Sequence, residues 1–543
     1  MSLDHLRVNR RRFLAGASAT LGALALRGYP VLAAAAAHFT HGVASGDPLA
    51  DRVILWTRVL PGSGAAERLD VAWEIAADEA FQQIISRGTA TTDSSSDYTV
   101  KVDAAGLSPA SQYFYRFSAQ GVYSVTGRTR TLPEVGVESL RLAVLSCSNY
   151  PQGYFNVYKE VASRPCDAVL HLGDYIYEYA QGGYANPIML ELGRNVEPEN
   201  EIVSIEDYRM RYGLYRTDVD LQAAHQNHPF ICVWDDHEIT NNTWQTGAEN
   251  HNEGEGAFDA RRRAAIQAYH EWLPIRGQGT IEEGIIYRSF EFGDLATLIM
   301  LDTRLVGRDQ QLSHEMNIDT LRSRLADEQR SIMGTTQENW LVGELQRSAQ
   351  AGKPWQIIGQ QLLMGKLFPP QVSDEELDPL QREAILAGRY GMLRTRGRQG
   401  LPLNLDAWDG YPENRSRTLK AFREHANNVV VLAGDTHSSW AFDLHADDNQ
   451  IVAVEFGTPS VTSPGFENFL ALPEGRLEEA TMQASPELKY MKANGRGWVE
   501  LDVQRDKVRA TWHFVSTITD RNYELVAGAT LETLAGAPAI HRV

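Results

Sequence analysis

DAVLHLGDYIYEY, residues 167–179, is an apolar run that ends abruptly in a glycine and an aspartate. The apolar part predicts a buried strand. Gly173 allows a tight turn after that strand, so Asp174 can reach a cation with little steric hindrance. Asp174 can bridge two cations through its two oxygens, and Tyr177 can turn its phenol oxygen to the same place. Gly173 and Asp174 alone also fit a structural turn without a cation, so other motifs in the chain are needed to support a metal site.

Four other stretches repeat this pattern of a hydrophobic strand followed by polar residues. They are RLAVLSCSNY (141–150), HPFICVWDDHE (228–238), KPWQIIGQQ (353–361) and NVVVLAGDTHSSW (428–440). Segments with helical apolar spacing, such as DARRRAAIQAYHEWLP (259–274), lie between them. Open α/β sheets build their sites at the carboxyl ends of strands, so we expect these turns to form one site.

The polar turns carry side chains suited to binding cations. Asp236 offers an oxygen ligand, and His237 beside it offers a hydrogen-bond donor or an acid; a helix-capping turn is the alternative reading. Asp435 and His437 are two residues apart on an extended segment, which places them on one side. An isolated histidine is more often a core residue, but one paired with aspartate after a glycine is a better ligand candidate.

The first part of the chain differs in character from the rest. Short strands separated by polar turns predict a small β-sandwich over residues 38–133, and LSPASQYFYRF (107–117) resembles the end of a fibronectin type III module. We expect a larger α/β domain over residues 138–520 and a C-terminal tail over 521–543. Within the larger domain, residues 373–400 have a helical pattern.

The N-terminus has the features of an export signal. Arg10, Arg11 and Arg12 precede Phe13, Leu14 and an alanine-rich stretch that ends near residue 37. This pattern predicts a twin-arginine signal peptide over residues 1–37, hence the twin-arginine translocation machinery as a partner and a periplasmic or secreted location. A membrane anchor is the alternative, but the apolar run is shorter than the roughly 18 residues that a span requires.

Charge and cysteine content narrow the classes of partner and fold. The 543-residue chain has a formal net charge of −19, which disfavours nucleic acid or an anionic membrane surface as the main partner. The only cysteines are Cys147, Cys166 and Cys232, an odd number that argues against a disulfide framework. Cys166 and Cys232 fit small core residues.

The order of the turns resembles the calcineurin-like metallophosphoesterase superfamily. That pattern has an aspartate in the first turn, then Gly-Asp, then Asn-His-Glu, then a pair of histidines. Here Cys147 and Asn149 stand in the first turn, Asp236 replaces the asparagine, and Asp435 replaces the first histidine of the pair. Gln360 and Gln361 stand where a histidine-bearing strand is expected.

This combination is similar to the PhoD-type alkaline phosphatase and phosphodiesterase family. HGVASGDP (41–48), YRTDVDLQAAH (215–225) and EFGTPSVTSPG (455–465) extend the resemblance over most of the chain. It implies an N-terminal β-sandwich followed by a calcineurin-like αββα sandwich as the catalytic domain, an α+β or α/β fold class.

The same resemblance implies Fe³⁺ together with one or two Ca²⁺, and the ligand chemistry agrees. Cys147, Tyr177, Asp174 and His437 suit a trivalent or borderline transition metal. Asp174, Asp236 and Asp435, with a carbonyl from Gln360 or Gln361, suit a hard cation such as calcium. A tetrahedral zinc at Cys147 is the competing reading, but the other cysteines lack CxxC spacing.

The implied activity is hydrolysis of phosphomonoesters and phosphodiesters, with release of phosphate, by a hydroxide activated between two metals. By their places in the motifs, Asn149 and His237 are expected to contact the phosphoryl oxygens or the leaving group. A phospholipase D-like phosphodiesterase acting on phospholipid head groups is the alternative enzyme. A surface-binding protein with a retired metal site is the alternative from another class.

Overall fold

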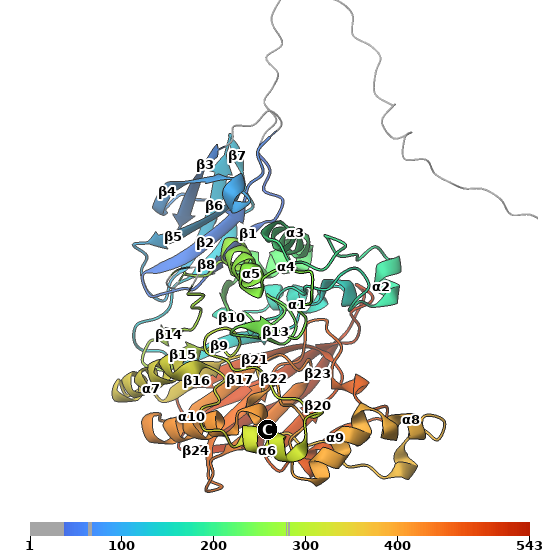
Figure 1. Ribbon diagram of the computed structural model, residues 1–543. Helices are drawn as coiled ribbons and strands as arrows, with labels where there is room; N and C mark the ends of the chain where they lie inside the picture. Colours follow the sequence, from blue (N-terminus) through green and yellow to red (C-terminus); the bar gives the residue numbers. More distant parts are fainter. Residues whose placement is uncertain (1–36, 63–67, 278–279, 281–282) are drawn as a thin grey trace, which may run out of the picture.

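The computed structural model describes residues 37–62, 68–277, 280 and 283–543 (Figure 1). The predicted signal peptide over residues 1–37 therefore lies, apart from Ala37, outside the described residues. In the described part, no helix is both long enough and apolar enough to cross a membrane. The chain alternates strands and helices after residue 138, as the sequence predicts.

The larger of two central sheets has ten strands in the described part of the chain. In spatial order these are β24 (Ala537–Arg542), β23 (Leu525–Leu534), β22 (Lys507–Val515), β21 (Arg496–Gln504), β9 (Ser139–Leu145), β10 (Ala168–His171), β11 (Pro229–Cys232), β1 (Val43–Gly46), β2 (Arg52–Arg58) and β5 (Thr99–Ala105). Strands β9, β10, β11 and β1 run parallel, so their carboxyl ends share one edge.

The second central sheet has seven strands in the same described region. In spatial order these are β14 (Arg288–Phe292), β15 (Ala296–Met300), β16 (Trp355–Gly359), β17 (Val429–Ala433), β19 (Ile451–Gly457), β18 (Ser439–His445) and β20 (Leu488–Lys492). Strands β15, β16, β17 and β19 are parallel. Strand β17 is a continuous apolar run, because parallel strands are covered on both faces.

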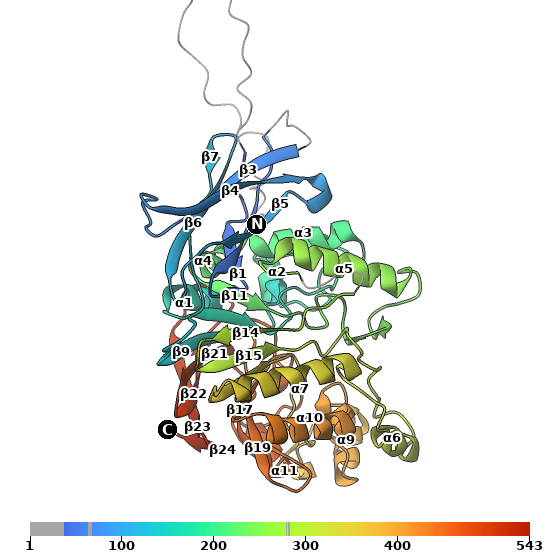
Figure 2. The same cartoon turned by 90° about the vertical axis from the view of Figure 1, so that its left-hand side faces the viewer.

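The two sheets pack face to face between layers of helices (Figures 1 and 2). Ile357 and Val430 of the second sheet join the core that is built on β9, β10 and β11. Their neighbours Ile358 and Val431 point the opposite way, into the core under helices α7 (Gly334–Gln350) and α10 (Pro412–His425). On the far side of the larger sheet lie α1 (Asn156–Ser163), α3 (Ile205–Arg216), α4 (Val219–Asn227) and α5 (Phe258–Trp272).

The strands of the predicted N-terminal sandwich are present, and three of them also belong to the larger central sheet, while the predicted domain boundary near residue 133 stays a prediction. Strand β1 pairs with β11, so β1, β2 and β5 extend the larger sheet. Their apolar side chains pack on a five-stranded sheet of β4 (Ile84–Asp93), β3 (Arg68–Ala76), β6 (Gln112–Ala119), β7 (Val122–Tyr123) and β8 (Gly127–Arg130). Backbone pairing between segments nearly 200 residues apart leaves no signal in local sequence. The likeness to a fibronectin type III module stays a prediction.

The last residues also differ from the sequence-based expectation. Residues 521–543, predicted as a tail, contribute β23 and β24, because β23 pairs along the full length of β22. Residues 373–400 are helical as predicted, with α8 (Arg382–Ala387) and α9 (Arg389–Arg398). The remaining helices are α2 (Pro187–Glu191), α6 (Ile318–Leu325) and α11 (Arg476–Ala484).

Candidate metal centre

The predicted site residues lie in turns at the carboxyl ends of four strands. Cys147 follows β9, Asp174 follows β10, Asp236 follows β11, and Asp435 follows β17 in the other sheet. The structure brings side chains from both sheets together, as the repeated pattern of strand and polar turn predicts.

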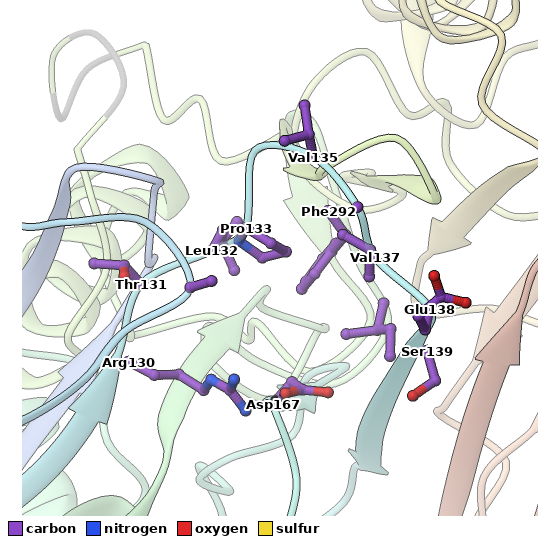
Figure 3. A pocket seen from close by; sticks show the side chains of 13 residues that line it. Arg130, Thr131, Leu132, Pro133, Val135, Val137, Glu138, Ser139, Asp167 and Phe292 are labelled. Atoms are coloured by element: carbon purple, nitrogen blue, oxygen red, sulfur yellow. Dashed lines mark hydrogen bonds and ion pairs between the residues drawn. The ribbon is translucent and has the colours of Figure 1, made fainter.

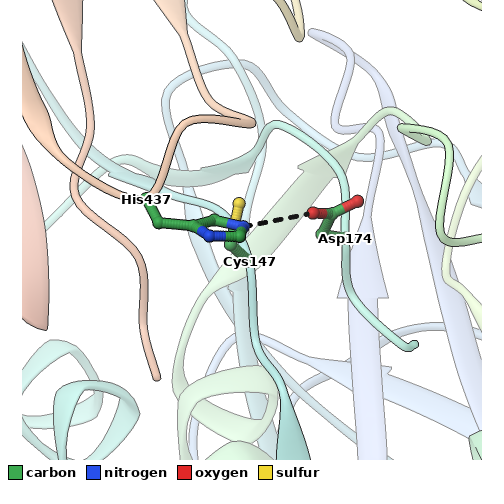
Figure 4. Close-up of side chains that lie close together, drawn as sticks. All are labelled: Cys147, Asp174 and His437. Carbon is green, nitrogen blue, oxygen red and sulfur yellow. Dashed lines mark ion pairs between the residues drawn. The ribbon is translucent and has the colours of Figure 1, made fainter. Parts of the chain in front are cut away.

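One group of ligand atoms combines sulfur, oxygen and nitrogen. Cys147, Asp174 and His437 offer atoms within 4.8 Å of one another, and their side chains converge in Figure 4. The phenol of Tyr177 lies 2.9 Å from Oδ2 of Asp174 and 3.1 Å from Nε2 of His437. These four are the residues predicted to bind the softer metal.

The histidine of this group is held in a defined tautomer by a backbone carbonyl. Nδ1 of His437 lies 2.9 Å from the carbonyl oxygen of Pro464, which can only accept a hydrogen bond. Nδ1 therefore carries the proton, and Nε2 presents its lone pair toward Tyr177 and Asp174. Metal-binding histidines in proteins are usually oriented by such an outer contact.

A second group of ligand atoms consists mainly of carboxylate oxygens. Asp174, Asp236 and His237 offer atoms within 4.8 Å of one another, and so do Asp235, Asp236 and Asp435. Asp174 thus belongs to both groups. Its Oδ1 and Oδ1 of Asp236 are buried and accept no hydrogen bond from the described residues. Buried carboxylate oxygens without partners are costly, and a bound cation would satisfy them.

Four of the candidate ligands adopt a backbone conformation that non-glycine residues rarely use. The φ angles are +62° at Cys147, +56° at Asp174, +60° at Asp435 and +61° at His437. Such strain costs about 1–3 kcal/mol per residue and persists where the surrounding structure requires it. Its concentration in one set of side chains supports a functional role for that set.

Burial keeps the thiol and the phenol protonated in the protein without metal. Burial, and next the charge of Asp174, raise the pKa of Cys147 well above its ordinary value. The same two causes raise the pKa of Tyr177. Binding as thiolate and phenolate would therefore need a cation beside them and would release protons.

Glu238, the last residue of the Asp-Asp-His-Glu turn, fixes the backbone of two ligand turns. Its Oε2 accepts hydrogen bonds from the backbone N–H groups of Asp174 at 2.9 Å and Asp235 at 2.6 Å. Burial, and next Asp174, raise the pKa of Glu238 to about 8. Glu238 therefore holds the backbone of the turns that carry Asp174 and Asp235, and it belongs to neither group of ligand atoms.

His237 pairs with a buried acid that the sequence analysis did not single out. Nδ1 of His237 lies 2.6 Å from Oε2 of Glu178, which is completely buried. Burial lowers the pKa of His237, but the charges of Glu178, Asp236 and Asp174 outweigh burial and raise that pKa well above its ordinary value. In the protein without metal, these three charges favour the protonated form of His237.

Asn149 and the two glutamines are placed differently from the metal ligands. Nδ2 of Asn149 donates to the carbonyl of Tyr184 at 3.0 Å, so its predicted contact with a phosphoryl group stays a prediction. Oε1 of Gln361 accepts from the backbone of Thr303 at 3.0 Å, and Oε1 of Gln360 accepts from Trp408 Nε1 at 3.1 Å. These carbonyls accept buried hydrogen bonds, and Gln360 or Gln361 as a calcium ligand stays a prediction.

Three other residues that contribute to the site were not predicted from the sequence. Two of them lie in EFGTPSVTSPG (455–465), a stretch that carried the family resemblance. Ser463 donates to the phenol oxygen of Tyr177 at 2.7 Å, and Pro464 orients His437. Arg304 forms ion pairs with Asp235 and Asp435. Arg304 lies in Leu301 to Arg304, where a strand ends and polar residues follow. The same sequence pattern predicted the other turns.

A separate pocket lies away from these ligands, where the N-terminal sandwich meets the larger sheet (Figure 3). Leu132, Pro133, Val137 and Phe292 form its apolar wall, and Arg130 with Asp167 closes one side. None of the predicted ligands lines this pocket.

Known protein families match most of this chain. A family model described as PhoD-like phosphatase matches residues 142–512, and one described as PhoD-like phosphatase, N-terminal domain, matches residues 25–133. The chain belongs to the PhoD-like phosphatase family. This PhoD-like chain is 34% identical to alkaline phosphatase D of Bacillus subtilis, over 97% of its own length and 87% of that protein.

A solved structure titled as the structure of PhoD extends the match to three dimensions. The TM-score is 0.79 at 32% sequence identity, over 95% of this chain and 93% of the other. The predicted family is confirmed, and this PhoD-like phosphatase is a hydrolase of phosphoric ester bonds.

Proposed function

We propose that this phosphatase depends on metals and hydrolyses phosphomonoesters and phosphodiesters with Fe³⁺ and Ca²⁺ at the site described above. The supporting observation is that one buried oxygen each of Asp174 and Asp236 accepts no hydrogen bond from the described residues, and that both residues belong to the groups of ligand atoms. Asp174 is common to both groups, which suits one carboxylate shared by two cations.

The donor types divide between the two metals. Cys147, Tyr177 and His437, with Asp174, would hold the iron, because thiolate, phenolate and imidazole suit a transition metal. Asp236 and Asp435, with Asp174, would hold one or two calcium ions, which prefer carboxylate oxygens. When bound, the cations would supply Lewis acidity that polarises the phosphoryl group and activates water.

His237 is the chain's own candidate for proton transfer. It carries a proton held by Glu178 at 2.6 Å and lies beside the ligand Asp236. Because the Nδ1 proton is held by Glu178, we assign to His237 the donation of its Nε2 proton to the leaving alkoxide oxygen, a role that requires a charged imidazole at the working pH. Tyr177 packs against the imidazole with ring centroids 4.3 Å apart, which limits the orientations of the ring.

Metal analysis and kinetics test this function together. Purified protein should contain iron and calcium by elemental analysis, and chelation should abolish hydrolysis of a monoester and a diester until both metals are restored. Cys147→Ala should lose iron and activity, whereas Cys166→Ala, the matched change at a cysteine outside the ligand groups, should keep both. Full activity in metal-free protein would refute the proposal. Activity on an intact phospholipid alone would favour the phospholipase D-like alternative.

The arrangement of the sheets supports a more specific assignment of the fold. Two sheets packed face to face between helical layers support a calcineurin-like αββα sandwich, and the strands before residue 133 support a fibronectin type III-like module. An ancestor shared with calcineurin-like enzymes would explain the turn order, in which Cys147 and Asp435 replace an aspartate and a histidine.

Export by the twin-arginine route is part of the proposal and rests on residues 10–14. Changing Arg10, Arg11 and Arg12 to lysine should retain the protein in the cytoplasm, as measured by fractionation and immunoblotting. Normal export of that variant would exclude the twin-arginine route without affecting the proposed chemistry.

A further inference from the structure

Arg304 lies in the turn that follows β15, and its side chain is completely buried. Oδ1 of Asp302 accepts hydrogen bonds from the backbone N–H of Arg304 at 2.8 Å and of Leu305 at 2.9 Å. Gln361 accepts from the backbone of Thr303 at 3.0 Å. The backbone that carries the arginine is thus held by two side chains from different strand ends.

The guanidinium of Arg304 contacts carboxylates on every side. Nε lies 2.5 Å from Oδ1 of Asp235, and Nη1 lies 2.7 Å from Oδ2 of Asp406. Nη2 lies 2.8 Å from Oδ1 of Asp435 and 3.5 Å from Oδ1 of Asp236. A lysine could not reproduce this planar fork, which makes separate contacts through each nitrogen.

These contacts join the carboxyl edges of the two central sheets. Asp235 and Asp236 follow β11 in the larger sheet, whereas Asp435 follows β17 in the smaller one. The two candidate ligands of the second cation, Asp236 and Asp435, therefore reach one place from different sheets. Arg304 is the positive group that touches both.

Charge repulsion would separate these carboxylates without the arginine. Asp235, Asp236 and Asp435 offer oxygens within 4.8 Å of one another, and like charges at that distance repel strongly in a buried site. The side chain of Asp435 can turn toward solvent, because it is 19% exposed. In the absence of Arg304, we expect the carboxylate of Asp435 to turn toward solvent.

We infer that Arg304 is a positioning residue, which holds Asp236 and Asp435 in the arrangement that binds the second cation. This inference rests on the proposed metal centre and adds a residue to it. Arg304 has no hydrogen bond or ion pair with Cys147, Tyr177 or His437 in the described structure, so the first group of ligands should not depend on it.

The test compares Arg304→Gln with Arg308→Gln. Arg308 is also a buried arginine and pairs with Asp406, but it has no ion pair with Asp235 or Asp435 among the described residues. Protein stripped of calcium by a chelator is titrated with calcium chloride in a calorimeter. Arg304→Gln should bind calcium at least ~10-fold more weakly than wild type, because outer partners of ligands contribute that much to metal affinity. Arg308→Gln should bind nearly as wild type does, and the visible absorption from the iron should be unchanged in both.

Each other result has a defined meaning. Calcium binding that is unchanged or tighter in Arg304→Gln would overturn the inference. Tighter binding would show that the guanidinium of Arg304 merely repels the cation and so weakens calcium binding in the wild type. Wild-type protein that binds no calcium would refute the proposed second cation, and the inference with it. If circular dichroism shows that Arg304→Gln does not fold, Arg304→Lys decides, because it keeps the charge and loses the fork. Wild-type calcium affinity in Arg304→Lys would then exclude a role for the fork.

Discussion

The carboxylate of Glu178, which is fully buried, lies 2.6 Å from Nδ1 of His237. Replacing Glu178 by Gln keeps the shape and removes the charge that helps raise the pKa of His237. We expect turnover to fall by about 10²-fold, the lower end of what a general acid contributes. The alkaline limb of the pH–rate profile should move to lower pH, because the imidazole then loses its proton earlier.

Thr240→Val is the matched control for this change. Thr240 also donates to Glu178, at 3.2 Å from Oε1, but it has no hydrogen bond with His237. Its pH–rate profile should stay close to wild type. An unshifted alkaline limb in Glu178→Gln would show that His237 does not donate a proton during turnover.

The strand-end turns could be predicted because each is local in sequence. A glycine after an apolar run, followed by Asp, is visible within a dozen residues, and Asp174 and Asp435 were found in this way, whereas Cys147 was assigned through the family resemblance of its turn. The structure confirms that these turns meet, since parallel strands place their carboxyl ends at one edge.

The outer contacts of the same site could not be predicted in this way. Arg304 is defined by acids from three other segments, and no local spacing reveals such partners. For the glutamines, the sequence shows a candidate oxygen donor but does not show the hydrogen bond that the carbonyl of Gln361 accepts from the backbone of Thr303. Likewise, the pairing of β1 with β11 depends on register between distant segments.

Tyr177→Phe tests the assignment of the first metal. A phenolate bound to ferric iron gives a visible charge-transfer band, so purified Tyr177→Phe protein should lose that band while it still contains iron. Ser463→Ala removes the hydrogen bond of 2.7 Å to the phenol oxygen and should shift the band to longer wavelength. The control is Tyr184→Phe, because Tyr184 lies near His437 but is not among the predicted ligands. A wild-type spectrum in Tyr177→Phe would exclude this tyrosine as an iron ligand.

Asp47→Ala tests how the N-terminal strands are attached. Asp47 accepts from Nη2 of Arg288 at 2.6 Å and from the backbone of Arg276 at 2.6 Å, and the ion pair is almost fully buried. Removing one partner leaves a buried arginine uncompensated, which typically costs about 3–5 kcal/mol. Denaturant unfolding should show a loss of that size. Asp51→Ala, at the exposed pair with Arg52, should change stability little, and equal losses in both variants would contradict this role for Asp47.

Asp409 predicts a pH dependence of stability that is independent of the metal ligands. Burial is the main cause that raises the pKa of Asp409 to about 7, and the side chain accepts from the backbone of Leu367 at 2.9 Å. An aspartate in an unfolded chain has a pKa of about 3.9. Between these values the folded state holds a proton that the unfolded state has released. The contribution to stability is therefore fully present below about pH 4 and is lost as the pH rises through about 7.

Asp409→Asn should remove this dependence, because its amide is neutral at every pH and its carbonyl can still accept from Leu367. Unfolding free energies measured in denaturant at pH 5 and pH 7 should fall less in the variant than in wild type. The difference should be at most about 2–3 kcal/mol, from ~1.4 kcal/mol per pH unit. Changing the exposed Asp506 to Asn is the control and should leave the wild-type slope intact. If wild type and Asp409→Asn show the same slope, Asp409 is ionised in the folded protein, and the hydrogen bond from Leu367 outweighs the cost of burial.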